Sequence, residues 1–335
     1  MTAASNNPAH SGGKKAAWHK VAAAIKVGIS VGLLWLLSTT YDVGDSIDRL
    51  AGVNLWWLLS ALVLFAILII LATFRWRVIL NALGENIPFW PATGIVTIGL
   101  FFNQVLPSNL GGDAMRIWRL HRRGAGLGRA VGSVMLDRVI ALVALAMLVL
   151  STLPLASGLI GDTRILTAFW LFIALVPLGL AALLWLDRLL VLFARILPGR
   201  LIDALEALAR DARAVLLNRR SCGAVLGFAL ANQILLVLLV IALAWGLGIP
   251  ARFGEFVVLI PPVILASVIP LSFAGWGVRE GAMIAMLGTI GIGATEAIAL
   301  SVAFGLVVLA GSLPGAVVWL VTGNRTAARP ATRQD

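Results

Sequence analysis

Six apolar runs, each long enough to cross a membrane as a helix, are spread along the whole chain. They cover about 21–40, 54–73, 127–150, 165–186, 222–247 and 296–321. A spanning helix needs about 20 apolar residues, and helices hydrogen-bond their own backbone where lipid cannot. Hydrophobic residues make up 60% of the 335 residues and charged residues 12%, whereas a soluble domain is about 45–50% apolar. The sequence predicts an all-α polytopic membrane protein.

Two further apolar runs are broken by polar residues and prolines. One covers 91–120 and is interrupted from Pro107 to Asp113; the other covers 254–290 and is interrupted from Pro270 to Glu280. The apolar arm that leads into each break is shorter than the roughly 20 residues of a full crossing. We therefore predict six full crossings plus two re-entrant broken hairpins.

The basic residues predict the orientation. If the N-terminus is inside and each broken run enters and leaves on one side, 21 of the 26 Lys and Arg residues fall in inside segments. Arg49, Arg164 and Arg252 fall outside, and Arg138 and Arg279 lie at membrane depth. Cytoplasmic loops are rich in Lys and Arg, so we expect both termini in the cytoplasm.

The same reading predicts the domain organisation. Polar basic cytoplasmic tails at 1–20 and 324–335 flank a single transmembrane domain at 21–323. Within it, segment 199–220 has leucines at helical spacing among arginines, which is typical of an amphipathic helix on the cytoplasmic face. A solvated connector helix is the alternative.

The two breaks are similar in sequence. "VLPSNLGGDAMR" and "VIPLSFAGWGVR" carry Pro, Gly and Arg at the same offsets, as Pro107, Gly112 and Arg116 in the first and as Pro270, Gly275 and Arg279 in the second. The predicted crossings give two halves, about 21–150 and 165–321, of opposite orientation. Together these patterns predict an inverted repeat, which is common in transporters.

The candidate substrate-binding residues come from both breaks and from the third crossing. They are Asn103, Gln104, Ser108, Asn109, Gly111, Gly112, Asp113, Arg116, Asp137, Arg138, Ser272, Gly275, Gly277, Arg279 and Glu280. The glycines permit a positive φ or a close approach. Ser108 or Asn109 could cap the returning arm, whose N-terminal N–H groups would favour an anion.

Charged side chains at membrane depth are expected to pair. Each costs at least about 2.5–3.5 kcal/mol at the bilayer centre, and neighbours on a helix point about 100° apart. We therefore expect Asp137 to pair with Arg116 or Arg279, and Arg138 with Asp113 or Glu280. Such pairs could be purely structural, or Arg116 could bind a lipid phosphate together with Arg119. Taken alone, Arg119 is expected to extend to the cytoplasmic surface.

"NQVLPSNLGGDAMR", "LDR" at Leu136 to Arg138 and "PLSFAGWGVREG" at Pro270 to Gly281 resemble the lysylphosphatidylglycerol synthase transmembrane family. That family includes the flippase half of bacterial multiple peptide resistance proteins, and the resemblance covers about 21–321. It implies a place in a bacterial inner (plasma) membrane and movement of a lipid or a lipid-linked group between leaflets. Members that make the lysyl-lipid carry a soluble aminoacyl-transferase domain, and this chain ends twelve residues after Gly323, so synthesis is not expected.

These observations favour a lipid translocase with a polar cavity near the midplane where the two hairpins meet. The expected partners are membrane lipids with an anionic or lipid-linked headgroup, without nucleic acid; homo-oligomerisation stays open. The sequence has no phosphate-binding GxxxxGK[ST] loop and no zinc motif, and we expect no cofactor, metal or catalytic residue. The alternatives are an intramembrane enzyme acting on a lipid phosphate or polyprenyl phosphate, and a non-transporting scaffold.

Overall fold

The computed structural model describes residues 49–50, 52–106, 111–161, 163–193, 198–268 and 276–323, together with Gly32 and Trp35. These residues form helices and no strands, which confirms the predicted all-helical fold. The helices are α3 (Leu55–Ala82), α4 (Phe89–Val105), α5 (Gly111–His121), α6 (Leu127–Leu159), α7 (Thr163–Leu184), α8 (Leu186–Phe193), α9 (Gly199–Leu216), α10 (Arg219–Gly246), α11 (Phe253–Val268), α12 (Val278–Gly288) and α13 (Ala294–Gly323).

Five of the described helices are long and apolar enough to cross a membrane, namely α3, α6, α7, α10 and α13. They coincide with five of the six predicted crossings. The sixth, at 21–40, lies outside the described residues except for Gly32 and Trp35. The tails at 1–20 and 324–335 lie entirely outside them. The two broken runs each form a pair of shorter helices, α4 with α5 and α11 with α12.

The prediction that Arg75 lies in an inside loop is wrong. Helix α3 continues to Ala82, well beyond the predicted end of its crossing at residue 73, and Arg75 is buried within it. The helix can continue because Asp137 of α6 neutralises Arg75, and Arg77 donates to the carbonyl oxygen of Ile87. Without Arg75, the segments predicted to lie inside still hold far more Lys and Arg than those predicted to lie outside.

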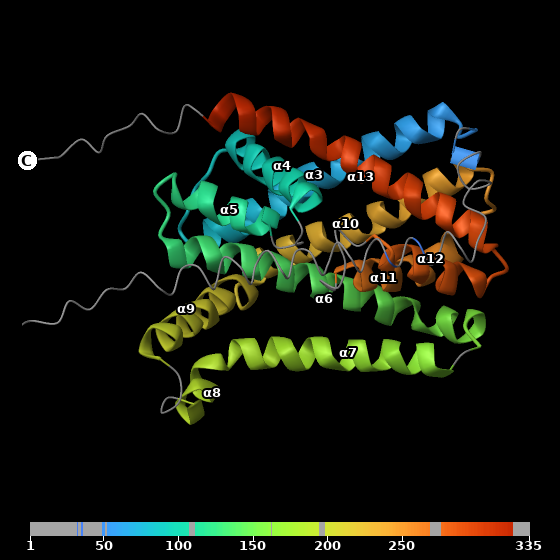
Figure 1. Cartoon of the computed structure of the whole chain (residues 1–335). Coiled ribbons are helices and arrows are strands. Elements are labelled where there is room, and N and C mark those ends of the chain that lie inside the picture. Colours follow the sequence, from blue (N-terminus) through green and yellow to red (C-terminus); the bar gives the residue numbers. More distant parts are fainter. Residues whose placement is uncertain are drawn as a thin grey trace, which may run out of the picture.

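Contacts between loops define one end of the helix bundle. Glu85, in the loop between α3 and α4, forms an ion pair of 3.2 Å with Arg129 at the start of α6. The chain therefore enters α4 and leaves α5 at the same end of the bundle, which we name the α5 end. Figure 1 shows α5 and α9 at this end, on the left.

A second set of contacts defines the opposite end. The N–H of Asn54, before α3, donates to the carbonyl oxygen of Gly246 in the last turn of α10 at 2.9 Å. Arg49 pairs with Glu296 at the start of α13. The chain thus enters α11 and leaves α12 at this end, which we name the α12 end and which lies on the right in Figure 1.

Helices α3 and α10 match in length and in their caps. Each has 28 residues and an Asn N-cap, Asn54 and Asn218, whose side chain accepts hydrogen bonds from the first turn. Each is followed by a glycine with positive φ, Gly84 and Gly248. The two helices pack against each other and run in opposite directions between the two ends. All these matched positions are 164 residues apart.

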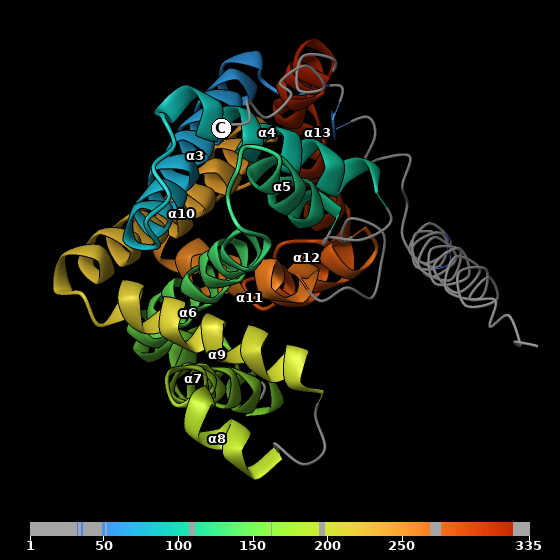
Figure 2. The same cartoon turned by 90° about the vertical axis from the view of Figure 1, so that its left-hand side faces the viewer.

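Helix α9 packs on the protein through its apolar face. Ala212 and Val215 are fully buried in a cluster with residues of α3, α6 and α10. Figure 2, which looks onto the α5 end, shows α7, α8 and α9 grouped on the side of α6 away from α3 and α13. A helix thus occupies the predicted amphipathic segment, but neighbouring helices cover part of its apolar face.

Candidate functional site

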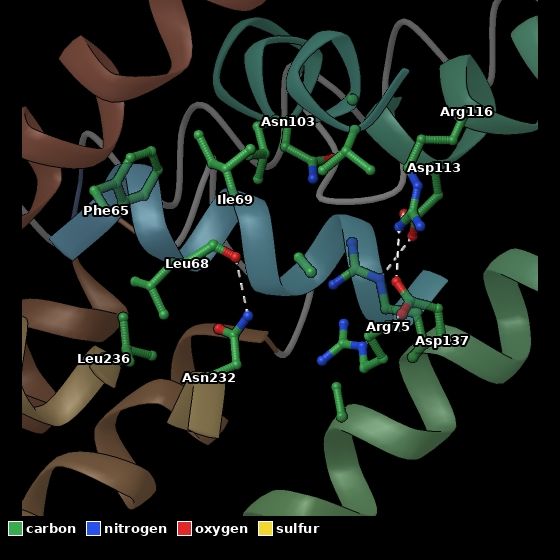
Figure 3. A pocket seen from close by; sticks show the side chains of 16 residues that line it. Phe65, Leu68, Ile69, Arg75, Asn103, Asp113, Arg116, Asp137, Asn232 and Leu236 are labelled. Carbon is green, nitrogen blue, oxygen red and sulfur yellow. Dashed lines mark hydrogen bonds and ion pairs between the residues drawn. The ribbon is translucent and has the colours of Figure 1, made fainter. Parts of the chain in front are cut away.

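A cavity of about 250 Å³ lies between α3, α4, α5, α6 and α10. One side of it is apolar and the other is charged (Figure 3). Its lining residues include the predicted site residues Asn103, Asp113, Arg116, Asp137 and Arg138. Leu68 and Asn232, near the middle of α3 and α10, also line it, so it lies well inside the helix bundle.

Asp137 is the centre of the charged side. One carboxylate oxygen accepts a hydrogen bond from Arg75 Nε at 2.7 Å, and the other accepts one from Arg116 Nη1 at 2.9 Å. All three side chains are at most 10% exposed. The guanidinium of Arg116 also lies over the ring of Trp76, 4.5 Å from its centroid. The carboxylate of Asp137 thus links its own helix α6 to α3 and α5.

Asp113 extends this network to a third arginine. Its Oδ2 accepts a hydrogen bond from Arg138 Nε at 2.8 Å, and its Oδ1 lies 3.9 Å from Arg116 Nη1. The charges therefore alternate in the order Arg75, Asp137, Arg116, Asp113, Arg138. Among the described residues, these three arginines and two carboxylates sum to one net positive charge.

The structure selects one alternative from each predicted pair. Asp137 pairs with Arg116 and not with Arg279, and Arg138 pairs with Asp113 and not with Glu280. Arg75 is the member of the network that sequence reasoning missed. No glycine or proline follows it until Gly84, which is a signal that the helix continues beyond the apolar run.

Glycines allow α4 and α5 to approach closely. A side chain at Gly112 would overlap the carbonyl oxygen of Gly99 and lie 2.6 Å from Asn103 Oδ1, and one at Gly111 would lie 2.6 Å from Leu106 Cδ1. Gly111 and Gly112 begin α5 and are not among the glycines with positive φ. Close approach, rather than an unusual backbone conformation, therefore explains these two glycines.

Asn103 caps α5 from the neighbouring helix. Its Oδ1 accepts a hydrogen bond from the N–H of Gly112 at 2.8 Å. That N–H is therefore not available to an anion, contrary to the expectation for the start of this helix. The predicted caps Ser108 and Asn109 lie outside the described residues, and Gln104 is not among the residues that line the cavity.

Two polar residues of α10 connect helices. Asn232 donates to the carbonyl oxygen of Leu68 at 3.1 Å, and Gln233 donates to that of Ala141 at 3.3 Å. Asn232 and Leu68 are themselves 164 residues apart, so equivalent positions of α3 and α10 touch each other directly.

Arg279 and Glu280 form a separate cluster at the α12 end. Arg279 Nη2 contacts Glu280 Oε1 at 2.8 Å, and both side chains bond to Ser301 of α13. The guanidinium of Arg279 stacks over Trp276, 4.7 Å from its centroid. No residue of α11 or α12 is among those lining the cavity, so the described residues of the two breaks do not meet in one site.

Glu280 also holds the start of α12. It accepts a hydrogen bond from the N–H of Gly277, which has a φ of 87°, a conformation that favours glycine. Ser272 and Gly275, the other predicted site residues of this break, lie outside the described residues. Among the residues that the structure does describe, no group of three His, Cys, Asp or Glu side chains could hold a metal ion.

Comparisons with known proteins agree with this architecture. The family described as lysylphosphatidylglycerol synthase TM region matches residues 23–315. A UPF0104 membrane protein of Methanothermobacter thermautotrophicus is 25% identical over 299 residues, which cover 81% of this chain and 84% of that protein.

Proposed function

The chain belongs to the family of the lysylphosphatidylglycerol synthase transmembrane region, and from this premise we propose that it moves a lipid between the leaflets of a membrane. The headgroup would occupy the cavity between α3, α4, α5, α6 and α10, while the hydrocarbon tails stay in the bilayer. No catalytic step is part of the proposal.

The net positive charge of the cavity carries this proposal. Among the described residues that line the cavity, three arginines (Arg75, Arg116 and Arg138) lie with two carboxylates (Asp113 and Asp137), and the buried Nε of Arg116 has no hydrogen-bond partner in the described part of the chain. Charges inside a membrane are costly and mark substrate pathways. Arginine suits the planar geometry of a phosphate group, so an anionic headgroup would complete the network.

The arrangement of the helices supports the proposal further. The matched lengths, caps and antiparallel packing of α3 and α10, and the two helix pairs at opposite ends, are what an inverted repeat would produce. Because most of the exposed arginines lie at the α5 end, that end would face the cytoplasm. The α4–α5 and α11–α12 pairs would then enter the membrane as re-entrant hairpins from opposite sides.

The test is leaflet exchange by the purified full-length protein in vesicles. Labelled phosphatidylglycerol and phosphatidylcholine, present in both leaflets, are exposed to a membrane-impermeant quencher. The proposal predicts that quenching of the anionic lipid proceeds past the outer-leaflet fraction, and that mass spectrometry finds the lipid unchanged. A new lipid product would instead indicate an enzyme, and quenching limited to the outer leaflet would indicate a scaffold.

Arg116→Lys should slow exchange by about tenfold, which corresponds to about 1.4 kcal/mol. Lysine keeps the charge opposite Asp137 but lacks the planar guanidinium, so the melting temperature should change little. The matched variant is Arg279→Lys, because Arg279 occupies the equivalent offset but lies away from the cavity. Exchange per folded protein should be unchanged in Arg279→Lys. Equal slowing in both variants would contradict a special role of the cavity.

The re-entrant arrangement predicts which positions share a side of the membrane. On a Cys222→Ala background, cysteines replacing Asn86 and Arg123 should react with an impermeant thiol reagent from the same side. A cysteine replacing Arg252 should react from the other side. All three positions are exposed. Reaction of positions 86 and 123 from opposite sides would show that α4 and α5 together cross the membrane.

A further inference from the structure

Arg119 is a buried arginine without a counter-charge among the described residues. It lies on the same face of α5 as Asp113 and Arg116, one turn beyond Arg116, and is only 6% exposed. Its Nε and Nη2 atoms are buried and have no hydrogen-bond partner among the described residues. Buried charged groups are normally paired, as Arg75 and Arg116 are, so this guanidinium differs from its neighbours. The expectation that it extends to the surface is wrong.

The surroundings of Arg119 are basic and aromatic. Its guanidinium carbon lies 5.5 Å from the centroid of the Trp118 ring, and that of Arg122 lies 5.0 Å from the same centroid. Arg122 and Arg123 are exposed. In the described ranges, none of these three arginines forms an ion pair within 4.0 Å with a carboxylate.

The position of this cluster fits the boundary of a membrane. It lies in the last turn of α5 and the loop that follows, at the α5 end of the bundle. Trp118 is 40% exposed, and tryptophan is enriched where the bilayer meets water. The phosphate groups of lipids lie at this depth, so a lipid phosphate is available as the partner that Arg119 lacks among the described residues.

We propose that Arg119, together with Arg122 and Arg123, binds the phosphate group of an anionic lipid at a site separate from the cavity. The buried Nε and Nη2 of Arg119 would donate two parallel hydrogen bonds to phosphate oxygens, and the exposed arginines would supply further positive charge. If the proposed function is correct, this site holds a headgroup one helical turn from the cavity. This part in transport rests on the proposed function, whereas the binding of the phosphate group by Arg119 does not.

The competing account is unspecific attraction of anionic lipids by a basic surface. It predicts that any exposed arginine at the α5 end matters as much as Arg119. Arg220, exposed at the start of α10, provides the matched substitution. A specific site predicts that Arg119→Met weakens binding at least tenfold and that Arg220→Met leaves it unchanged.

The experiment measures the melting temperature of the full-length protein in neutral detergent as ligand is added. The probes are dihexanoyl phosphatidylglycerol, dihexanoyl phosphatidylcholine and inorganic phosphate. A ligand that binds the folded state stabilises it by RT ln(1 + c/Kd), where c is the free ligand concentration, so at a given ligand concentration tighter binding raises the melting temperature further. We expect wild type and Arg220→Met to respond to phosphatidylglycerol and not to phosphatidylcholine, and Arg119→Met to bind at least tenfold more weakly. A response to inorganic phosphate at the same concentration would assign the site to free phosphate.

The ligand-free proteins provide a second readout. Because Arg119 has no described partner, Arg119→Met should melt at the wild-type temperature or above it, since an unpaired buried charge is removed. Equal binding by Arg119→Met and wild type would overturn the proposal, and so would equal losses in Arg119→Met and Arg220→Met. An Arg119→Met protein that melts well below wild type would show that Arg119 is structural. Arg119-dependent binding without lipid exchange would refute the proposed function and keep this site.

Discussion

Replacing Asp137 by asparagine should destabilise the protein by about 3–5 kcal/mol, the usual cost of removing one partner from a buried ion pair. Asp137 accepts hydrogen bonds from both Arg75 and Arg116, so the substitution leaves two buried guanidinium groups without their carboxylate. Lipid exchange should be lost as well, because the excess positive charge in the cavity rises and the three helices are no longer held together. Thermal unfolding and vesicle exchange measure the two effects.

Asp203→Asn provides the matched control. Asp203 is exposed on α9, where exposed charges contribute about 0–1 kcal/mol, so its melting temperature and exchange rate should stay close to those of the wild type. Similar small effects of both substitutions would mean that the carboxylate of Asp137 does not hold the network together.

Replacing Gly112 by alanine should destabilise the protein by about 3 kcal/mol or more, at the upper end of the cost of overpacking. The added methyl group would overlap the carbonyl oxygen of Gly99. A backbone atom cannot rotate away as a side chain can, so α4 and α5 would have to separate. The hydrogen bond from the N–H of Gly112 to Asn103 would be lost with that separation. Melting temperature measures the effect.

Gly227→Ala is the control for helix propensity. Gly227 lies within α10 and is exposed, and a Cβ there meets nothing within 4 Å. Alanine at such a position is neutral or stabilises a helix by up to about 1 kcal/mol. A Gly112→Ala protein as stable as Gly227→Ala would contradict the close packing of α4 on α5.

Local sequence properties were sufficient to predict the described helices except α8. Continuous apolar runs gave the five described spans, and the prolines and glycines of the breaks gave the four shorter helices. The ends of α3 were less predictable. Arg75 is buried near the C-terminal end of α3 because it meets a carboxylate 62 residues away, and this long-range partner is not visible in the local pattern.

The charged residues of the site could be identified because a charge inside a membrane is energetically costly and therefore has a role. The sequence left two possible partners for Asp137 and two for Arg138. Spacing along the chain does not show which helices touch. It also did not show that Asn103, rather than a residue of the break itself, caps α5. The buried state of Arg119 could not be predicted, since an arginine near a helix end can equally extend to water.

The two breaks are similar in sequence and each forms a pair of short helices, but their arginines make different contacts. Arg116 and Arg279 occupy the same offset in the two motifs. However, Arg116 faces Asp137 at the cavity, whereas Arg279 faces Glu280 and Ser301 in a compact cluster. The difference arises from the residues on the helices that face them, and the motifs alone do not contain it.

The most direct measurement is the rate of lipid exchange before and after a charged group is attached inside the cavity. On a Cys222→Ala background, Ala141→Cys places a thiol at a residue that lines the cavity, and Ala204→Cys places one on the exposed surface of α9. A sulfonate-bearing methanethiosulfonate reagent modifies both, and mass spectrometry gives the extent of labelling. If headgroups pass through the cavity, labelling at position 141 stops exchange and labelling at position 204 leaves it unchanged. Undiminished exchange by protein fully labelled at position 141 would contradict this account.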